Sequence, residues 1–137
     1  MRLSKGLLLC MIIGSCIISC DPYGGYEYWI NNLSDSSIYV VYSYRYNDTI
    51  ISQEVKSNQN MKFLHFETHG GLYDEGIQDL YSLCDSFAIF TDTINKRLIG
   101  KDYSKRVEWT YMQDKIGCSD RSGDNIYTFT IQNKDLK

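Results

Sequence analysis

The stretch IYVVYSYRY at residues 38–46 decides the fold class. It is dense in β-branched and aromatic residues, which are enriched in strands because they pack well on a pleated, half-buried surface. Asn47-Asp48 separates it from Thr-Ile-Ile at residues 49–51, and both of these turn residues tolerate the positive φ that a two-residue hairpin loop requires. The stretch therefore predicts a β-strand that continues into a hairpin.

Further strand signals recur at short spacing on both sides of this hairpin. Residues 126–132 alternate, and alternate residues of a strand lie on opposite faces of the sheet. Strands are expected at residues 26–30, 38–46, 49–51, 61–68, 86–91, 96–100, 107–111 and 126–132, with one short helix at 74–83. Strands do not alternate with long helices, which disfavours a nucleotide-binding α/β fold.

Seven or so short strands, one weak helix and a single proline predict an all-β chain. The favoured architecture is an antiparallel β-sandwich of immunoglobulin-like type, formed by one domain over residues 27–137. A small β-barrel is the alternative.

The first twenty residues differ in character from the rest. Arg2 and Lys5 precede an uncharged apolar run from Leu7 to Ile18. A run of roughly a dozen residues is too short to cross a hydrocarbon core of about 30 Å, which needs about 20 residues in a helix. Its length suits the apolar region of a secretory signal peptide.

The end of this run, Ile17-Ile18-Ser19-Cys20, resembles the lipobox of bacterial lipoproteins. The resemblance implies that the Cys20 thiol receives a diacylglyceryl group, that residues 1–19 are removed, and that the new amine is acylated with a chain such as palmitate. Cys16 offers a competing site, but Cys20 is preferred because it stands at the end of the apolar run. Residues 20–26 are then expected to form a short tether, because Pro22 and Gly24-Gly25 disfavour regular structure.

These features place the chain in the cell envelope, held to a membrane by lipid, with the outer membrane favoured. Asp21 follows the lipidated cysteine, a position that directs retention at the inner membrane in some bacteria and surface export in others. The membrane and the side that the domain faces therefore stay open. The tyrosine- and asparagine-rich strands, such as residues 28–32, also resemble small uncharacterised lipoproteins of Gram-negative anaerobes, a likeness that carries no functional residues.

The net charge of the chain limits the kinds of partner that it can bind. The full chain has a net charge of −3. Removal of residues 1–19 would take away Arg2 and Lys5 and make the net charge more negative. An acidic chain without a long basic run argues against nucleic acid as a partner.

Of the five cysteines, Cys84 and Cys118 remain for the mature domain, where they form a candidate disulfide in an oxidising compartment. Two buried free thiols are the alternative.

His65, Glu67 and His69 are the only cluster of histidines with a carboxylate. On a strand they would share one face with Phe63, while Leu64 and Phe66 lie on the other. Imidazole and carboxylate are zinc ligands, but the spacing is not the helical His-Glu-x-x-His pattern. A polar strand end is the favoured interpretation, so we expect no metal and no cofactor.

A catalytic nucleophile is not apparent either. No Gly-x-Ser-x-Gly motif occurs, and Cys84 stands in an apolar stretch where desolvation would leave its thiol inert. We therefore expect that the chain is not an enzyme.

Four of the twelve tyrosines, Tyr39, Tyr42, Tyr44 and Tyr46, form a candidate binding surface. Exposed tyrosine can stack on sugar rings or contact a protein partner. A structural role is the favoured interpretation, because the last three share a strand face with Val40 and are therefore candidates for the core.

Thr49 and Thr93 each stand in an Asp-Thr-Ile sequence. This pattern resembles the acceptor of the O-glycosylation system of certain Gram-negative anaerobes, so both threonines are candidate glycosylation sites. Two ordinary strand starts are the alternative interpretation.

These features rank three functions. The first is a non-enzymatic binding or accessory module of the cell envelope that recognises a glycan or a protein. The second is an immunity-type periplasmic lipoprotein that neutralises a toxin by forming a complex with it. An envelope hydrolase ranks last, for want of a site.

Overall fold

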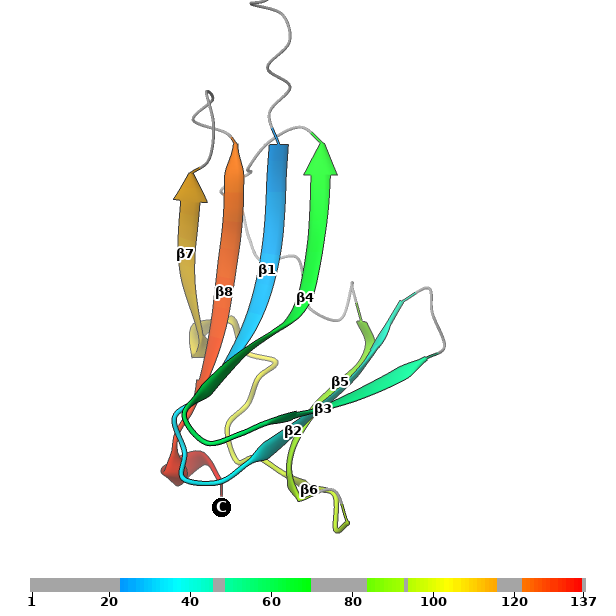
Figure 1. Ribbon diagram of the computed structural model, residues 1–137, viewed down its shortest axis with the longest axis vertical. Coiled ribbons are helices and arrows are strands. Elements are labelled where there is room, and N and C mark those ends of the chain that lie inside the picture. The colour runs from blue at the N-terminus through cyan, green and yellow to red at the C-terminus, as the bar shows by residue number, and fades with distance from the viewer. Residues whose placement is uncertain (1–22, 46–48, 70–83, 93, 116–121, 137) are drawn as a thin grey trace, which may run out of the picture.

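The computed structural model describes residues 23–45, 49–69, 84–92, 94–115 and 122–136, with the backbone alone at 23, 68 and 69. The predicted helix at 74–83 lies outside these ranges. The described part forms eight strands and two short 3-10 helices (Figure 1). The strands are β1 Tyr23–Asn32, β2 Ile38–Tyr44, β3 Ile50–Val55, β4 Gln59–His69, β5 Cys84–Asp92, β6 Arg97–Leu98, β7 Trp109–Lys115 and β8 Gly123–Ile131, and the 3-10 helices are η1 Arg106–Glu108 and η2 Asn133–Asp135.

The strands form two four-stranded sheets, in the orders β4-β1-β8-β7 and β3-β2-β5-β6. This arrangement confirms the predicted all-β sandwich, and antiparallel pairs predominate in both sheets. The strands of the predicted hairpin do pair antiparallel, from Ser43 opposite Ile50 to Ile38 opposite Val55, whereas its predicted turn residues Asn47-Asp48 lie outside the described residues. One pair differs from the prediction: β1 and β8 run parallel over nine registered residues, from Gly24 opposite Gly123 to Asn32 opposite Ile131.

Inward-facing aromatic residues of both sheets fill the core. Along β8 the buried positions alternate with half-buried ones, as the sequence pattern predicts. The Tyr28 ring of β1 lies 5.1 Å from the Tyr127 ring and 5.9 Å from the Trp109 ring. Phe63 of β4 stacks on Phe87 of β5 at 4.9 Å and so joins the two sheets. These ring contacts lie in the range in which aromatic pairs add to the stability that burial provides.

The sequence predicts a tether over residues 20–26, but the last four of these residues belong to a strand. β1 begins at Tyr23, and Gly24 and Gly25 both lie within the sheet, paired with β4 on one side and with β8 on the other. Glycine disfavours a strand through its entropy, but tertiary pairing on both edges overrides that preference. The first described strand therefore begins at Tyr23, within the segment predicted to be a tether.

The predicted alternation of side chains along β4 fails at Phe63. The register between β1 and β4 shifts between Tyr28 and Trp29, so that Phe63 forms a bulge. A bulge inserts one extra residue and changes which face the following side chains occupy. As a result Phe63 and Leu64 are both buried, whereas His65 faces the outside of the sheet.

Candidate functional site

The outer face of the β4-β1-β8-β7 sheet is mainly polar. Its centre is a network around Glu27 of β1, whose carboxylate is almost fully buried. The Lys62 ammonium donates to Glu27 Oε1 at 2.6 Å, and the Trp29 indole N–H donates to Oε2 at 2.8 Å. The same ammonium lies 5.6 Å from the centre of the Trp29 ring. The three side chains therefore satisfy one another.

This network lowers the pKa of Glu27. Burial acts to raise the pKa of the carboxyl, but the hydrogen bonds from Lys62 and Trp29 outweigh it and hold the pKa below its ordinary value of 4.5. A carboxyl with a lowered folded-state pKa stabilises the fold above its unfolded pKa, and this stabilisation is lost as the pH falls through the folded-state pKa.

The free energy of unfolding of a Glu27→Gln variant is therefore expected to depend less on pH than that of the wild type. At neutral pH the variant loses about 1 kcal/mol, because it lacks the charge that Lys62 and Trp29 contact. Below pH 4.5 the difference from the wild type shrinks as the wild-type carboxyl becomes protonated. Urea unfolding at pH values from 7 to 3 measures both effects, and a constant difference across this range would contradict the account.

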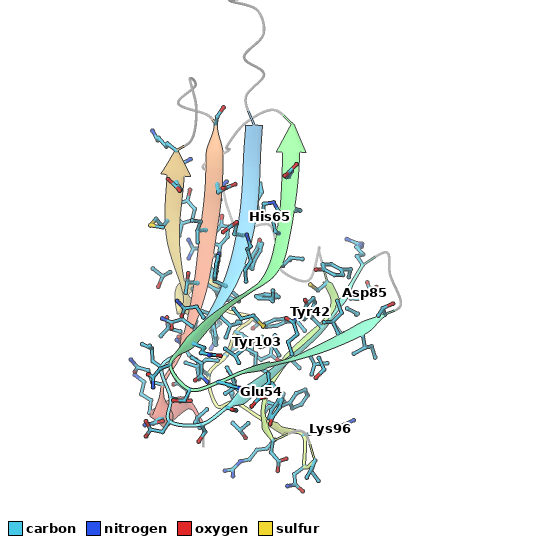
Figure 2. All side chains as sticks on the ribbon, viewed as in Figure 1. Tyr42, Glu54, His65, Asp85, Lys96 and Tyr103 are labelled. Carbon is cyan, nitrogen blue, oxygen red and sulfur yellow. The ribbon has the colours of Figure 1, made fainter. Side chains whose placement is uncertain are left out.

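The candidate zinc ligands lie beside the same network. His65, labelled on β4 in Figure 2, has Nδ1 3.6 Å from Glu27 Oε1 and Nε2 3.7 Å from Glu67 Oε1. Its two nitrogens thus face two different carboxylates, one of which already binds Lys62. The His69 side chain lies outside the described residues. Within the described ranges, no group of three or more histidine, cysteine, aspartate or glutamate side chains could hold a metal ion.

A polar hollow of about 450 Å³ lies near the C-terminal end of β8. Its lining carries two lysines and two carboxylates, of which three have partners: Lys101 Nζ donates to Thr130 O at 2.8 Å and lies 3.5 Å from Glu108, and the Gln132 N–H donates to Asp135 at 2.9 Å. The hollow therefore needs no ligand to balance its charges. It is lined by Lys101, Glu108, Thr130, Gln132, Lys134 and Asp135.

The outer face of the β3-β2-β5-β6 sheet has a different character. Strand pairing places its outward side chains in three rows across the sheet, and apolar residues dominate two of them. Ile50 and Leu98 are 69% and 51% exposed, and the other apolar members are half-buried. Glu54 is the one charged residue in the three rows. We call six of these residues the apolar face: Tyr39, Val41, Ile50, Ala88, Phe90 and Leu98.

Such a face is unusual on the water side of a sandwich. Antiparallel sheets with one solvated side normally alternate apolar residues inward with polar residues outward. On β2 the inward residues Ile38 and Val40 are fully buried, yet the outward residues Tyr39 and Val41 that follow each of them are also apolar. A contiguous exposed apolar patch with a polar rim is characteristic of an interaction site.

Sequence reasoning missed this face, although a signal for it exists. The runs at residues 38–42 and 87–90 are apolar at successive positions, which is the pattern of a strand that is shielded from water on both sides. Recognising the face also requires the register that places Tyr39 beside Phe90 and Phe90 beside Leu98.

The four tyrosines of the predicted surface do not share one environment. Tyr42 is buried against Phe63 and Tyr44, and burial raises the pKa of its hydroxyl to about 12. Tyr44 packs partly against the core, and Tyr39 lies on the apolar face. The prediction of a common tyrosine surface is therefore wrong for Tyr42, because alternate strand residues point inward. Tyr46 lies outside the described residues.

The remaining candidate residues are only partly described. Cys84 is buried, and the pKa of its thiol is raised to about 11, by burial first and by Asp85 second. Cys118 lies outside the described ranges, so the candidate disulfide stays a prediction. Thr49 is exposed just before β3, and Thr93 is outside the described ranges. Cys20 and the lipobox also precede the first described residue.

Comparisons with protein-family models, with curated proteins and with solved structures find no match for this chain. In the described ranges no helix is long and apolar enough to cross a bilayer.

Proposed function

We propose that this chain is a lipid-anchored, non-enzymatic protein-binding module of the cell envelope. Lipid on Cys20 would hold the domain to the membrane. Because β1 begins at Tyr23, the tether between lipid and sheet is only a few residues long. In Figure 1 β1 begins at one end of the described part and β6 lies at the opposite end, so Leu98 of the apolar face lies far from the start of β1.

The single observation that carries the proposal is the apolar face. It combines two aromatic and four aliphatic side chains on one side of a sheet, the composition of the buried centre of a protein interface. Glycan recognition requires polar groups beside the stacking ring to bond the sugar hydroxyls. Here the Ser43 and Ser86 hydroxyls bond each other at 2.8 Å, and Ser52 and Glu54 are the only other non-apolar residues in the three rows, against six residues of the apolar face. A protein partner is therefore favoured over a glycan.

Site-specific photo-crosslinking in the producing cells tests this proposal. A photoreactive amino acid at Leu98, on the apolar face, is expected to give a discrete adduct with one protein. The same amino acid at Thr110, exposed on the outer face of the other sheet, is the matched control and should give none. Equal labelling at both positions, or no adduct at Leu98, would overturn the proposal. An adduct with an exported toxin would identify an immunity protein, and one with another envelope protein an accessory module.

A further inference from the structure

We further propose, building on the function above, that the partner adds an extended strand to the free edge of β3. This strand carries a basic residue opposite Glu54 and an apolar residue opposite Ile50. The apolar face then continues onto the partner.

The first support is the open edge of β3. β3 is the terminal strand of its sheet, and its register with β2 continues without a bulge from Ile50 to Val55. A strand pairs through alternate residues on each side, so a terminal strand presents a row of N–H and C=O groups along its outer edge. Among the described residues β3 contacts mainly β2. Its edge can therefore accept another strand.

The second support is that β3 carries few of the devices that usually protect an edge, with Glu54 as its one charged residue. Natural edge strands are blunted by shortness, by bulges, by proline or by charged residues, lysine above all. β6 is only two residues long, β4 has a bulge and carries Lys62, and β7 ends in Asp114 and Lys115. β3 reads IISQEV, with no lysine, arginine or proline. It is thus the least protected edge in the described part of the sandwich.

The third support is charge complementarity at Glu54, which Figure 2 labels. Residues that pair across neighbouring strands lie on the same face, and opposite charges there attract. Glu54 is exposed and pairs with Tyr39 on its β2 side, and it forms no ion pair with another described residue. A lysine or arginine on an added strand would supply the missing counter-charge.

A second copy of this chain fits the edge less well. Antiparallel pairing of two β3 strands centred on Ser52 would place each Glu54 opposite an Ile50 of the other copy. Both carboxylates would then lie beside an aliphatic side chain, with no counter-charge. A different strand that runs antiparallel to β3 fits better. Its outward residues, in chain order, would be a basic one opposite Glu54, a polar one opposite Ser52 and an apolar one opposite Ile50.

Binding of two synthetic peptides to the full chain, purified in detergent, tests this inference. The first probe is Thr-Lys-Val-Thr-Val-Ile-Thr, and the second replaces its lysine with glutamate. The lysine peptide is expected to bind up to about fivefold more tightly, since cross-strand charge pairs contribute up to about 1 kcal/mol. It should also protect alternate amides of β3 from hydrogen exchange.

A Glu54→Lys variant is expected to reverse the preference between the two peptides. A Glu67→Lys variant, altered on β4 of the other sheet, is the matched control and should keep it. The inference is overturned if β3 amides stay unprotected, if Glu54→Lys leaves the preference unchanged, or if the chain self-associates through β3 instead. A discrete adduct at Leu98 together with any of these results would retain the proposed function and reject strand addition alone.

Discussion

Replacing Cys20 with alanine is expected to move the chain from the membrane fraction to the soluble fraction. In the proposed function all membrane attachment comes from acyl chains on this residue. Each buried methylene contributes about 0.8 kcal/mol, so two or three chains anchor a protein stably, whereas none leaves no attachment. Fractionation of producing cells, combined with labelling by a fatty-acid analogue, measures both the location and the modification.

The matched control is Cys16→Ala, which removes the competing cysteine of the leader. This variant should remain lipidated and bound to the membrane. If Cys16→Ala releases the chain and Cys20→Ala does not, the lipidation site has been assigned to the wrong cysteine. If neither variant changes the location, the lipoprotein interpretation is wrong.

Replacing Tyr28 with alanine is expected to lower the free energy of unfolding by about 4 kcal/mol, the usual cost of truncating a buried aromatic residue. Tyr28 is 1% exposed on the central strand β1, and its ring contacts Phe63, Trp109 and Tyr127. Small domains are stable by only about 5–15 kcal/mol, so the variant loses a large share of its stability.

Urea unfolding of the Tyr28→Ala chain beside a Met112→Ala chain checks this prediction. Met112 is 58% exposed, so its truncation should change the free energy of unfolding by less than about 0.5 kcal/mol. Equal effects of the two substitutions would show that the core does not centre on Tyr28.

The positions of the strands could be predicted because their side chains repeat with a period of two. Residues 126–132 show this best, since their alternation appears unchanged in the burial of β8. The start of β1 could not be predicted, because two adjacent glycines disfavour a strand locally and only pairing with β4 and β8 orders them. The bulge at Phe63 and the parallel direction of β8 also depend on contacts between distant segments.

The candidate site was less predictable than the fold. A tyrosine on a strand has the same local pattern whether it faces the core or the outside, so Tyr42 and Tyr39 could not be separated until the register was known. The apolar face combines four strands that are far apart in the chain. No local motif marks it, and its apolar runs resemble those of an ordinary core strand.

The most direct test of the central claim is the native size of the complex that mild detergent extracts from the envelope. Three chains are compared: the wild type, Leu98→Asp on the apolar face, and Thr110→Asp on the opposite sheet. If the apolar face holds a protein partner, the wild type and Thr110→Asp elute together as a complex larger than one chain. Leu98→Asp then elutes as the free protein. If all three elute at the same size, the apolar face does not hold a protein partner and the proposed function is wrong.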